Sequence, residues 1–149
     1  MKIVLVHPEI PQNTGNIIRT CAVTGTGLVL VRPLGFHFSD RKLKRAGLDY
    51  WDQVDITLID DLPSFLATAG PPFFFSSHAT TFYHEVSYPE DALLIFGSET
   101  RGLDAGYREL WPHAFYKIPM RGKSRCLNLA NAVSIVLYEG LRQNNFALF

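Results

Sequence analysis

The sequence predicts an α/β protein built on a mainly parallel sheet of six strands that is flanked by helices. Apolar runs of strand length alternate with helical patterns along most of the 149 residues, and this alternation is typical of a parallel sheet. Two runs, 3–6 and 28–31, are apolar at every position, as expected for strands that are buried on both faces. Because a domain has typically about 150 residues and neither a linker nor a repeat interrupts the chain, a single domain over 1–149 is expected.

Each expected element is bounded by residues that start or stop it. The six strands are expected at 3–6, 28–31, 54–59, 73–75, 92–96 and 115–118. The helices are expected at 13–25, 41–46, 61–69, 103–110 and 128–143. Asn13 and Thr14 can cap the first helix and Gly25 can end it, while Asn128 can cap the last. The last helix has the longest apolar stripe, made by Leu129, Ala132, Val133, Val136 and Leu137.

The formal net charge is zero, from 14 basic and 14 acidic residues, but the charges are segregated along the chain. Residues 1–45 carry a net charge of +5, residues 46–100 carry nine acids and no Lys or Arg, and residues 101–149 carry +4. Such segregation favours an anionic partner such as nucleic acid, although ordinary scatter over a solvated surface would give the same counts. The acidic segment is expected to form a face turned away from that partner.

Secretion, a membrane span and a metal site are not indicated. The apolar run after Met1 is too short for a signal peptide or a span, and two cysteines, Cys21 and Cys126, make no disulfide framework. The histidines and cysteines lack the spacing of zinc ligands. Residues 122–124 suggest a P-loop, but Lys117 stands where that motif needs a glycine. We expect a cytoplasmic protein without a bound metal.

Three loops that follow predicted strands carry the polar residues best suited to chemistry, because ligands of parallel sheets bind beyond the carboxyl ends of the strands. The loops are 8–16, which leads to Arg19; 96–103, with Glu99 and Arg101; and 118–132, with Arg121, Lys123 and Arg125. The first exposes backbone amides at a helix start, which suit an anion. Taken singly, each loop is equally compatible with a helix cap, a tight turn or a basic surface loop.

Together, three stretches of these loops are more specific than any one of them: residues 13–19 (NTGNIIR), 96–103 (FGSETRGL) and 127–133 (LNLANAV). In this order they resemble the three motifs of the SPOUT superfamily of RNA methyltransferases. The resemblance is closest to the small, single-domain TrmL/YibK-like tRNA 2′-O-methyltransferases, which act at the wobble nucleotide, and it extends over nearly the whole chain.

The resemblance implies an α/β sheet whose C-terminal part is tied into a trefoil knot, with S-adenosylmethionine bound in the knotted loops. It implies a homodimer in which the helix of Tyr138 packs between subunits. By position, the cofactor residues are Phe75, Gly97, Ile118, the backbone of Met120, Cys126 and Asn128. Relatives usually have serines at the positions of Cys126 and Ala130, and a thiol is a weaker hydrogen-bonding group than a hydroxyl.

The activity implied is methylation of the ribose 2′-hydroxyl of nucleotide 34, a cytidine or modified uridine, in the anticodon loop of a leucine tRNA. Arg19 resembles the family's catalytic arginine, which can stabilise a developing alkoxide together with an RNA phosphate. We hypothesise that Glu99 and Asn13 hold Arg19 in place. A role of Glu99 as the general base is the alternative.

Basic residues from two segments are expected to contact the phosphates of a tRNA anticodon stem-loop: Arg41, Lys44, Arg45, Arg101, Arg121, Lys123 and Arg125. Tyr50, Trp51 or His78 could stack on a base, although a place in the core is the commoner one for Tyr50 and Trp51. Two other functions stay open. The target could be another tRNA position or a ribosomal RNA, or the chain could be a non-catalytic module that binds RNA or a nucleotide.

Overall fold

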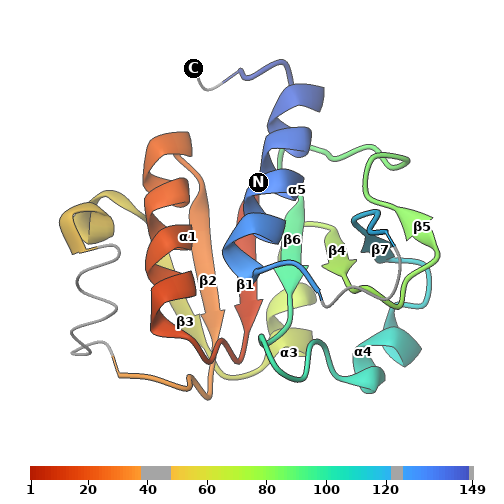
Figure 1. Ribbon diagram of the computed structural model, residues 1–149, viewed down its shortest axis with the longest axis horizontal. Helices are drawn as coiled ribbons and strands as arrows, with labels where there is room; N and C mark the ends of the chain where they lie inside the picture. The colour runs from red at the N-terminus through yellow and green to blue at the C-terminus, as the bar shows by residue number, and fades with distance from the viewer. Residues whose placement is uncertain (38–47, 122–125, 148–149) are drawn as a thin grey trace.

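The computed structural model describes residues 1–37, 48–121 and 126–147, and within these ranges seven parallel strands form one sheet (Figure 1). The strands lie in the order β3-β2-β1-β6-β4-β7-β5. Their bounds are β1 Lys2–Val6, β2 Gly27–Val31, β3 Ile56–Ile59, β4 Pro72–Phe75, β5 Thr81–Phe82, β6 Leu93–Phe96 and β7 Phe115–Lys117. The predicted parallel α/β class is confirmed.

The prediction of six strands was one too few. All six predicted strands are present, and β5 is added at the edge of the sheet beside β7. β5 has only two residues, so it has no apolar run or alternation by which a sequence pattern could reveal it.

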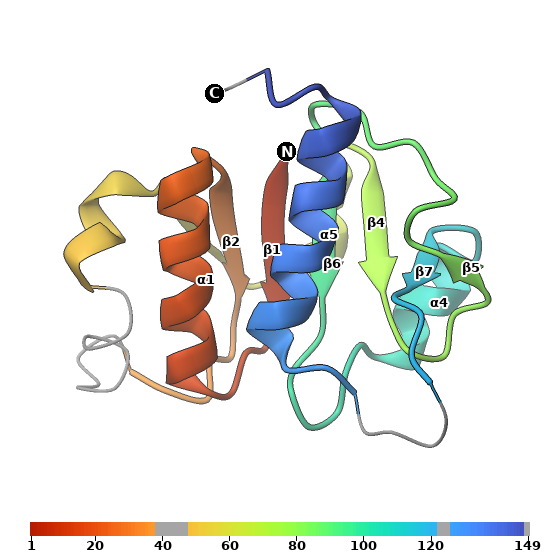
Figure 2. The same ribbon diagram turned by 45° about the horizontal axis from the view of Figure 1, so that its top comes forward.

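Helices cover both faces of the sheet. Their bounds are α1 Pro11–Thr24, the 3₁₀ helix η1 Leu48–Gln53, α3 Leu62–Leu66, α4 Ala105–Leu110 and α5 Leu129–Gln143. The long helices α1 and α5 lie side by side on one face, as Figure 2 shows, and α3 and α4 pack on the other. None of the helices in the described ranges is both long and apolar enough to cross a membrane.

The predicted start of α1 was wrong, whereas its end and the start of α5 are confirmed. α1 begins at Pro11, and Asn13 lies inside its first turn as a buried residue instead of capping it. Gly25 ends α1 with a φ of 66°, a left-handed conformation that suits glycine. Asn128 caps α5 by accepting a 2.9 Å hydrogen bond from the amide of Ala130. The predicted helix at 41–46 lies outside the described residues.

The core consists of two layers because successive side chains of each strand point to opposite faces. In β1, Ile3 and Leu5 pack under α1 and α5, whereas Val4 and Val6 pack toward α3 and α4. All four side chains are buried, so the continuous apolar run reflects burial on both faces. The sheet therefore presents its polar loops only at its ends.

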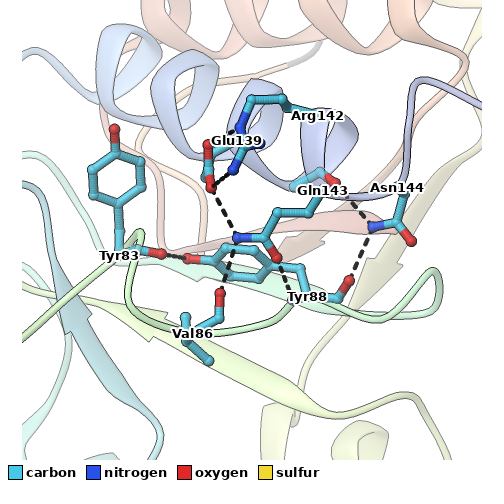
Figure 3. A network of polar contacts seen from close by, with 8 residues as sticks. Tyr83, Val86, Tyr88, Glu139, Arg142, Gln143 and Asn144 are labelled. Carbon is cyan, nitrogen blue, oxygen red and sulfur yellow. Dashed lines mark hydrogen bonds and ion pairs between the residues drawn. The ribbon is translucent and has the colours of Figure 1, made fainter.

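The C-terminal end of α5 is fastened to the loop between β5 and β6 by side-chain amides (Figure 3). Gln143 Nε2 donates to the carbonyl of Val86 at 3.0 Å, and its Oε1 accepts from the amide of Tyr88 at 2.9 Å. Asn144 Nδ2 donates to the carbonyl of Tyr88 at 2.9 Å. This loop leads into β6, so the network anchors the strand that enters the middle of the sheet.

Glu139 completes this network and makes it sensitive to pH. Hydrogen bonds from the Arg142 guanidinium, at 2.8 and 2.9 Å, lower the pKa of the Glu139 carboxyl to about 2, assisted by a bond from Gln143. A carboxyl whose pKa is depressed by folding stabilises the protein above its ordinary pKa, and that contribution is lost as the pH falls through the folded value.

The free energy of unfolding of Glu139→Gln is therefore expected to lie below that of the wild type at neutral pH. The gap should narrow as the pH falls from about 4.5 to about 2. Urea denaturation across this range measures the gap. Glu109→Gln, an exposed glutamate on α4, is the matched control and should show little gap at any pH. A gap for Glu139→Gln that stays constant with pH would contradict the assignment.

Candidate functional site

The three loops singled out in the sequence meet at the carboxyl edge of the sheet, the lower edge in Figures 1 and 2. β1 and β6 are neighbours, so the loop that enters α1 lies beside the loop 97–104. The strands β4 and β7 follow next in the sheet and end at the same edge. The segment 126–128 then enters α5 beside α1.

The Glu99 carboxylate caps α1 from a different loop. Its Oε1 accepts from Asn13 Nδ2 at 2.9 Å and from the amide of Ile10 at 3.2 Å, and its Oε2 accepts from the amide of Glu9 at 2.8 Å. The N-cap residue, Ile10, has no side-chain oxygen that could do this. A carboxylate at a helix N-terminus is stabilised by the unpaired amides and by the helix dipole. Glu99 therefore fixes where α1 begins.

Glu9 returns the same kind of contact to the second loop. Its Oε2 accepts from the amide and the hydroxyl of Thr100, at 3.2 and 2.6 Å. Its Oε1 lies 3.8 Å from the guanidinium of Arg101, whose side chain is 82% exposed. Each of the two loops thus holds the other through a carboxylate, and we call these contacts of Glu9 and Glu99 the carboxylate clasp.

Asn13 and Asn128 extend the carboxylate clasp to the third loop. Because Asn13 Nδ2 donates to Glu99, its Oδ1 is left as an acceptor, and Asn128 Nδ2 donates to it at 2.9 Å. Asn128 Oδ1 caps α5 at the same time. One chain of hydrogen bonds therefore runs from Glu99 through α1 to the start of α5 and joins all three sequence motifs.

Gly97 is required by the second loop itself. Ser98 and Gly102 exchange backbone hydrogen bonds of 3.2 and 2.9 Å, which close the loop on itself. A Cβ at Gly97 would lie 2.1 Å from the carbonyl carbon of Gly102, so no side chain fits there. Gly102 has a φ of 70°, which also favours glycine. The backbone at Gly97 therefore lies close against the backbone of Gly102 in the same loop.

The predicted cofactor residues lie along the same edge. Phe75 ends β4 and stacks on Phe96 with ring centroids 4.9 Å apart, so it belongs to the core. Ile118 is half-buried after β7. Met120 and Leu127 leave 38% of their surface exposed on the adjoining loops. Apolar side chains that stay accessible on loops at this edge, together with the backbone amides and carbonyls of those loops, suit a ligand that has both an apolar ring and polar edges.

Cys126 bridges the edge to the loop after β4. Its Sγ lies 3.6 Å from Ser77 Oγ, a contact between residues that sequence reasoning did not connect. Ser77 directly follows Phe75 and Ser76 at the end of β4, and this position at a strand end was the one signal that could have found it. The Cys126 side chain thus contacts Ser77, which lies in the loop that follows β4.

Arg19 does not join Glu99 and Asn13. Arg19 stands six positions after Asn13, which places it about 9 Å further along the helix axis and on another face of the helix. Among the described residues, Glu99 and Asn13 bond to each other, to the start of α1 and to Asn128. The exposed guanidinium of Arg19 instead lies over the ring of Tyr50 in η1, 5.3 Å from its centroid. The hypothesis that Glu99 and Asn13 hold Arg19 therefore disagrees with the described contacts.

The expected RNA-contacting residues fall into two groups. Arg101 is exposed beside the carboxylate clasp. Arg121 is exposed next to Met120, which with Ile118 and Leu127 makes up what we call the apolar edge. Arg41, Lys44, Arg45, Lys123 and Arg125 lie outside the described residues. The acidic segment does not stand apart from the basic ones, because Asp55 pairs with Lys2 at 3.2 Å and Asp60 with Arg32 at 2.7 Å.

Comparison with known proteins agrees with this arrangement. Residues 1–138 match the SpoU rRNA Methylase family. A tRNA (cytidine(34)-2'-O)-methyltransferase from Escherichia coli strain K12 is 45% identical over 146 residues, which are 96% of this chain and 93% of the relative. A protein of the same name from Saccharophagus degradans is 45% identical over 148 residues, 97% of this chain and 96% of the relative.

Solved structures give the same result. A structure described as giving insights into the 2-OH methylation of C/U34 on tRNA has a TM-score of 0.89 at 45% identity and covers 97% of this chain and 96% of its own. The SpoU methyltransferase AviRb from Streptomyces viridochromogenes, in complex with AdoMet, has a TM-score of 0.84 at 25% identity, with coverages of 99% and 61%. The fold is thus that of a methyltransferase. This chain belongs to the SpoU rRNA methylase family.

Removal of the Glu99 carboxylate is expected to destabilise the whole edge. Glu99→Ala leaves two backbone amides and the Asn13 amide without their acceptor, so the free energy of unfolding should fall by about 2–4 kcal/mol. Glu99→Gln keeps one acceptor oxygen and should cost about half as much. Urea denaturation measures both. If Glu99→Ala costs no more than Glu109→Ala, at an exposed glutamate of α4, the clasp contributes nothing to stability.

Proposed function

We propose that this chain transfers the methyl group of S-adenosylmethionine to the 2′-hydroxyl of the wobble nucleotide 34 of tRNA, with a leucine tRNA as its substrate. The observation that carries the proposal is the chain of hydrogen bonds that joins Glu99, Asn13 and Asn128, one from each motif. The relatives named for cytidine 34 are 45% identical over nearly their whole length, which supports the same target.

The apolar edge fits the proposed cofactor. S-adenosylmethionine carries a flat adenine, polar ribose and amino-acid groups and a methyl group on a sulfonium. Ile118, Met120 and Leu127 offer apolar surface to the adenine, and the backbone of the loops around Gly97 and Cys126 offers polar partners. A backbone contact at residue 126 is unaffected by a cysteine in place of serine. When bound, the cofactor supplies an electrophilic methyl carbon.

The residues of this chain would then align and activate the ribose 2′-hydroxyl, which accepts the methyl group. The 2′-oxygen would bond to the methyl carbon while the carbon–sulfur bond breaks to leave a neutral thioether, and the proton of the hydroxyl would pass to solvent water. A guanidinium offers only donors and no acceptor, so Arg19 would stabilise the developing alkoxide and a neighbouring RNA phosphate and would not act as a base. Glu99 is poorly suited to be the base, since its two oxygens already accept three hydrogen bonds.

We further propose that the active form is a homodimer and that the C-terminal part of the sheet is knotted, as the family resemblance implies. Support for the dimer comes from apolar side chains on the outer surface of the adjacent helices α1 and α5. Val23 is 56% exposed on α1, and Ile135 and Tyr138 are 37% and 46% exposed on α5. Contact between two copies through these helices would remove the apolar surface of these side chains from water.

Arg19→Ala is expected to stop methyl transfer without releasing the cofactor. Removal of a group that stabilises charge in the transition state costs about 100- to 1,000-fold in kcat. Mass spectrometry of nucleosides from methylated tRNA measures the transfer, and isothermal titration measures the affinity for S-adenosylmethionine. Arg32→Ala, at an exposed arginine paired with Asp60, is the control and should keep wild-type turnover. Wild-type turnover by Arg19→Ala would refute the catalytic role of Arg19. If the wild type does not bind S-adenosylmethionine, the proposed methyltransferase activity is refuted.

Binding of tRNA is expected to weaken with salt despite a net charge of zero. Each phosphate contact releases a counterion, so the affinity should fall about tenfold or more between about 50 and 200 mM salt. Filter binding or fluorescence anisotropy with an anticodon stem-loop measures the affinity. The Arg121→Ala variant should show a shallower dependence. A flat dependence for the wild type would mean that the basic segments do not contact phosphates.

A further inference from the structure

The contact between Arg19 and Tyr50 joins the proposed catalytic arginine to an element that no motif includes. The centre of the Arg19 guanidinium lies 5.3 Å from the centroid of the Tyr50 ring, within the range of a cation–π interaction. Tyr50 belongs to η1, Leu48–Gln53, which packs against α1 beside the sheet (Figure 1).

The Tyr50 ring is itself held in place by the core. It is half-buried and packs against the apolar cluster that includes Ile17 and Ile18 on the inner surface of α1. The ring is therefore held by the core, and the guanidinium of Arg19 lies over it. An arginine side chain on a helix surface otherwise samples many rotamers, and fixing it costs conformational entropy. The anchored ring reduces the number of rotamers available to Arg19.

An aromatic ring is better suited than a carboxylate to hold a catalytic arginine such as Arg19. A carboxylate would occupy the guanidinium N–H groups and neutralise its charge, as Glu139 does to Arg142. A ring contacts the flat face of the guanidinium and leaves the N–H groups, which point outward in its plane, to donate to an anion. Stabilisation of an alkoxide or a phosphate needs those donors and that charge.

We propose that Tyr50 is the positioning residue of Arg19: its ring orients the guanidinium toward the acceptor and keeps its donors available. This inference rests on the proposed function of Arg19. It assigns Tyr50, instead of Glu99 and Asn13, as the residue that holds the guanidinium of Arg19. Tyr50 would act through Arg19 and not by contact with the cofactor or the reacting atoms.

The test compares Tyr50→Leu, which removes the ring, with Tyr50→Phe, which keeps it. Tyr50→Leu should lower kcat by about two- to fivefold, the value of one exposed cation–π contact. The affinity for S-adenosylmethionine should not change, and Tyr50→Phe should match the wild type. In an Arg19→Ala background, where no cation lies over the ring, Tyr50→Leu should have no further effect on the residual turnover. Equal losses in both backgrounds, or a Tyr50→Phe as impaired as Tyr50→Leu, would overturn the proposal.

NMR of the arginine side chains separates this proposal from the proposed function. The Hε resonance of Arg19, assigned by its loss in Arg19→Lys, should be shifted upfield by the ring current of Tyr50 in the wild type. The shift should persist in Tyr50→Phe and disappear in Tyr50→Leu. An unshifted wild-type resonance refutes the contact whether or not Tyr50→Leu folds. A shifted resonance in a protein that transfers no methyl group refutes the proposed function and leaves the contact intact.

Discussion

The Glu99 carboxylate at the first turn of α1 is the contact on which the site depends. The three motifs lie far apart in the chain and follow different strands, so the strands alone bring their loops near one another without fixing them. Three N–H groups from the first loop converge on the two oxygens of Glu99, at 2.8 to 3.2 Å. Hydrogen bonds to a carboxylate are stronger than neutral ones, and one of them here pairs the amide of Ile10, the N-cap residue of α1, which the helix leaves unpaired. Asn13 then passes the constraint to Asn128 and so to the start of α5.

α1 carries two separate sets of contacts. One set joins the loops of the site, and the other holds the residue proposed to take part in the chemistry. Near the start of the helix, Asn13 is buried and holds the loops together. About 9 Å further along the axis, Arg19 is exposed and rests on Tyr50. Because the helix is rigid, the clasp that fixes its start also fixes where Arg19 stands relative to the proposed cofactor edge. The carboxylate that shapes the site is thereby kept away from the guanidinium whose charge the chemistry needs.

The sequence predicted those features that depend on local pattern. The buried parallel strands, the end of α1 at Gly25 and the cap of α5 by Asn128 each follow from a few neighbouring residues. It could not predict the start of α1, because the cap comes from Glu99, 86 residues beyond Asn13. The two-residue strand β5 and the contact of Tyr50 with Arg19 also depend on tertiary packing and leave no periodic signal. The sequence predicted that Glu99 and Asn13 hold Arg19, and it connected neither of them to Asn128, because the bond between Asn13 and Asn128 joins residues 115 positions apart.

We propose that the protein, through these joined loops, methylates the ribose 2′-hydroxyl of nucleotide 34 of tRNA. The most direct measurement is a map, by mass spectrometry, of 2′-O-methyl groups in tRNA from cells that lack this protein and from cells in which it has been restored. We predict that nucleotide 34 of at least one leucine tRNA loses its 2′-O-methyl group in the deletion and regains it on restoration, with every other 2′-O-methyl group unchanged. An unchanged nucleotide 34, or a loss at another position of tRNA or in ribosomal RNA, would contradict the claim.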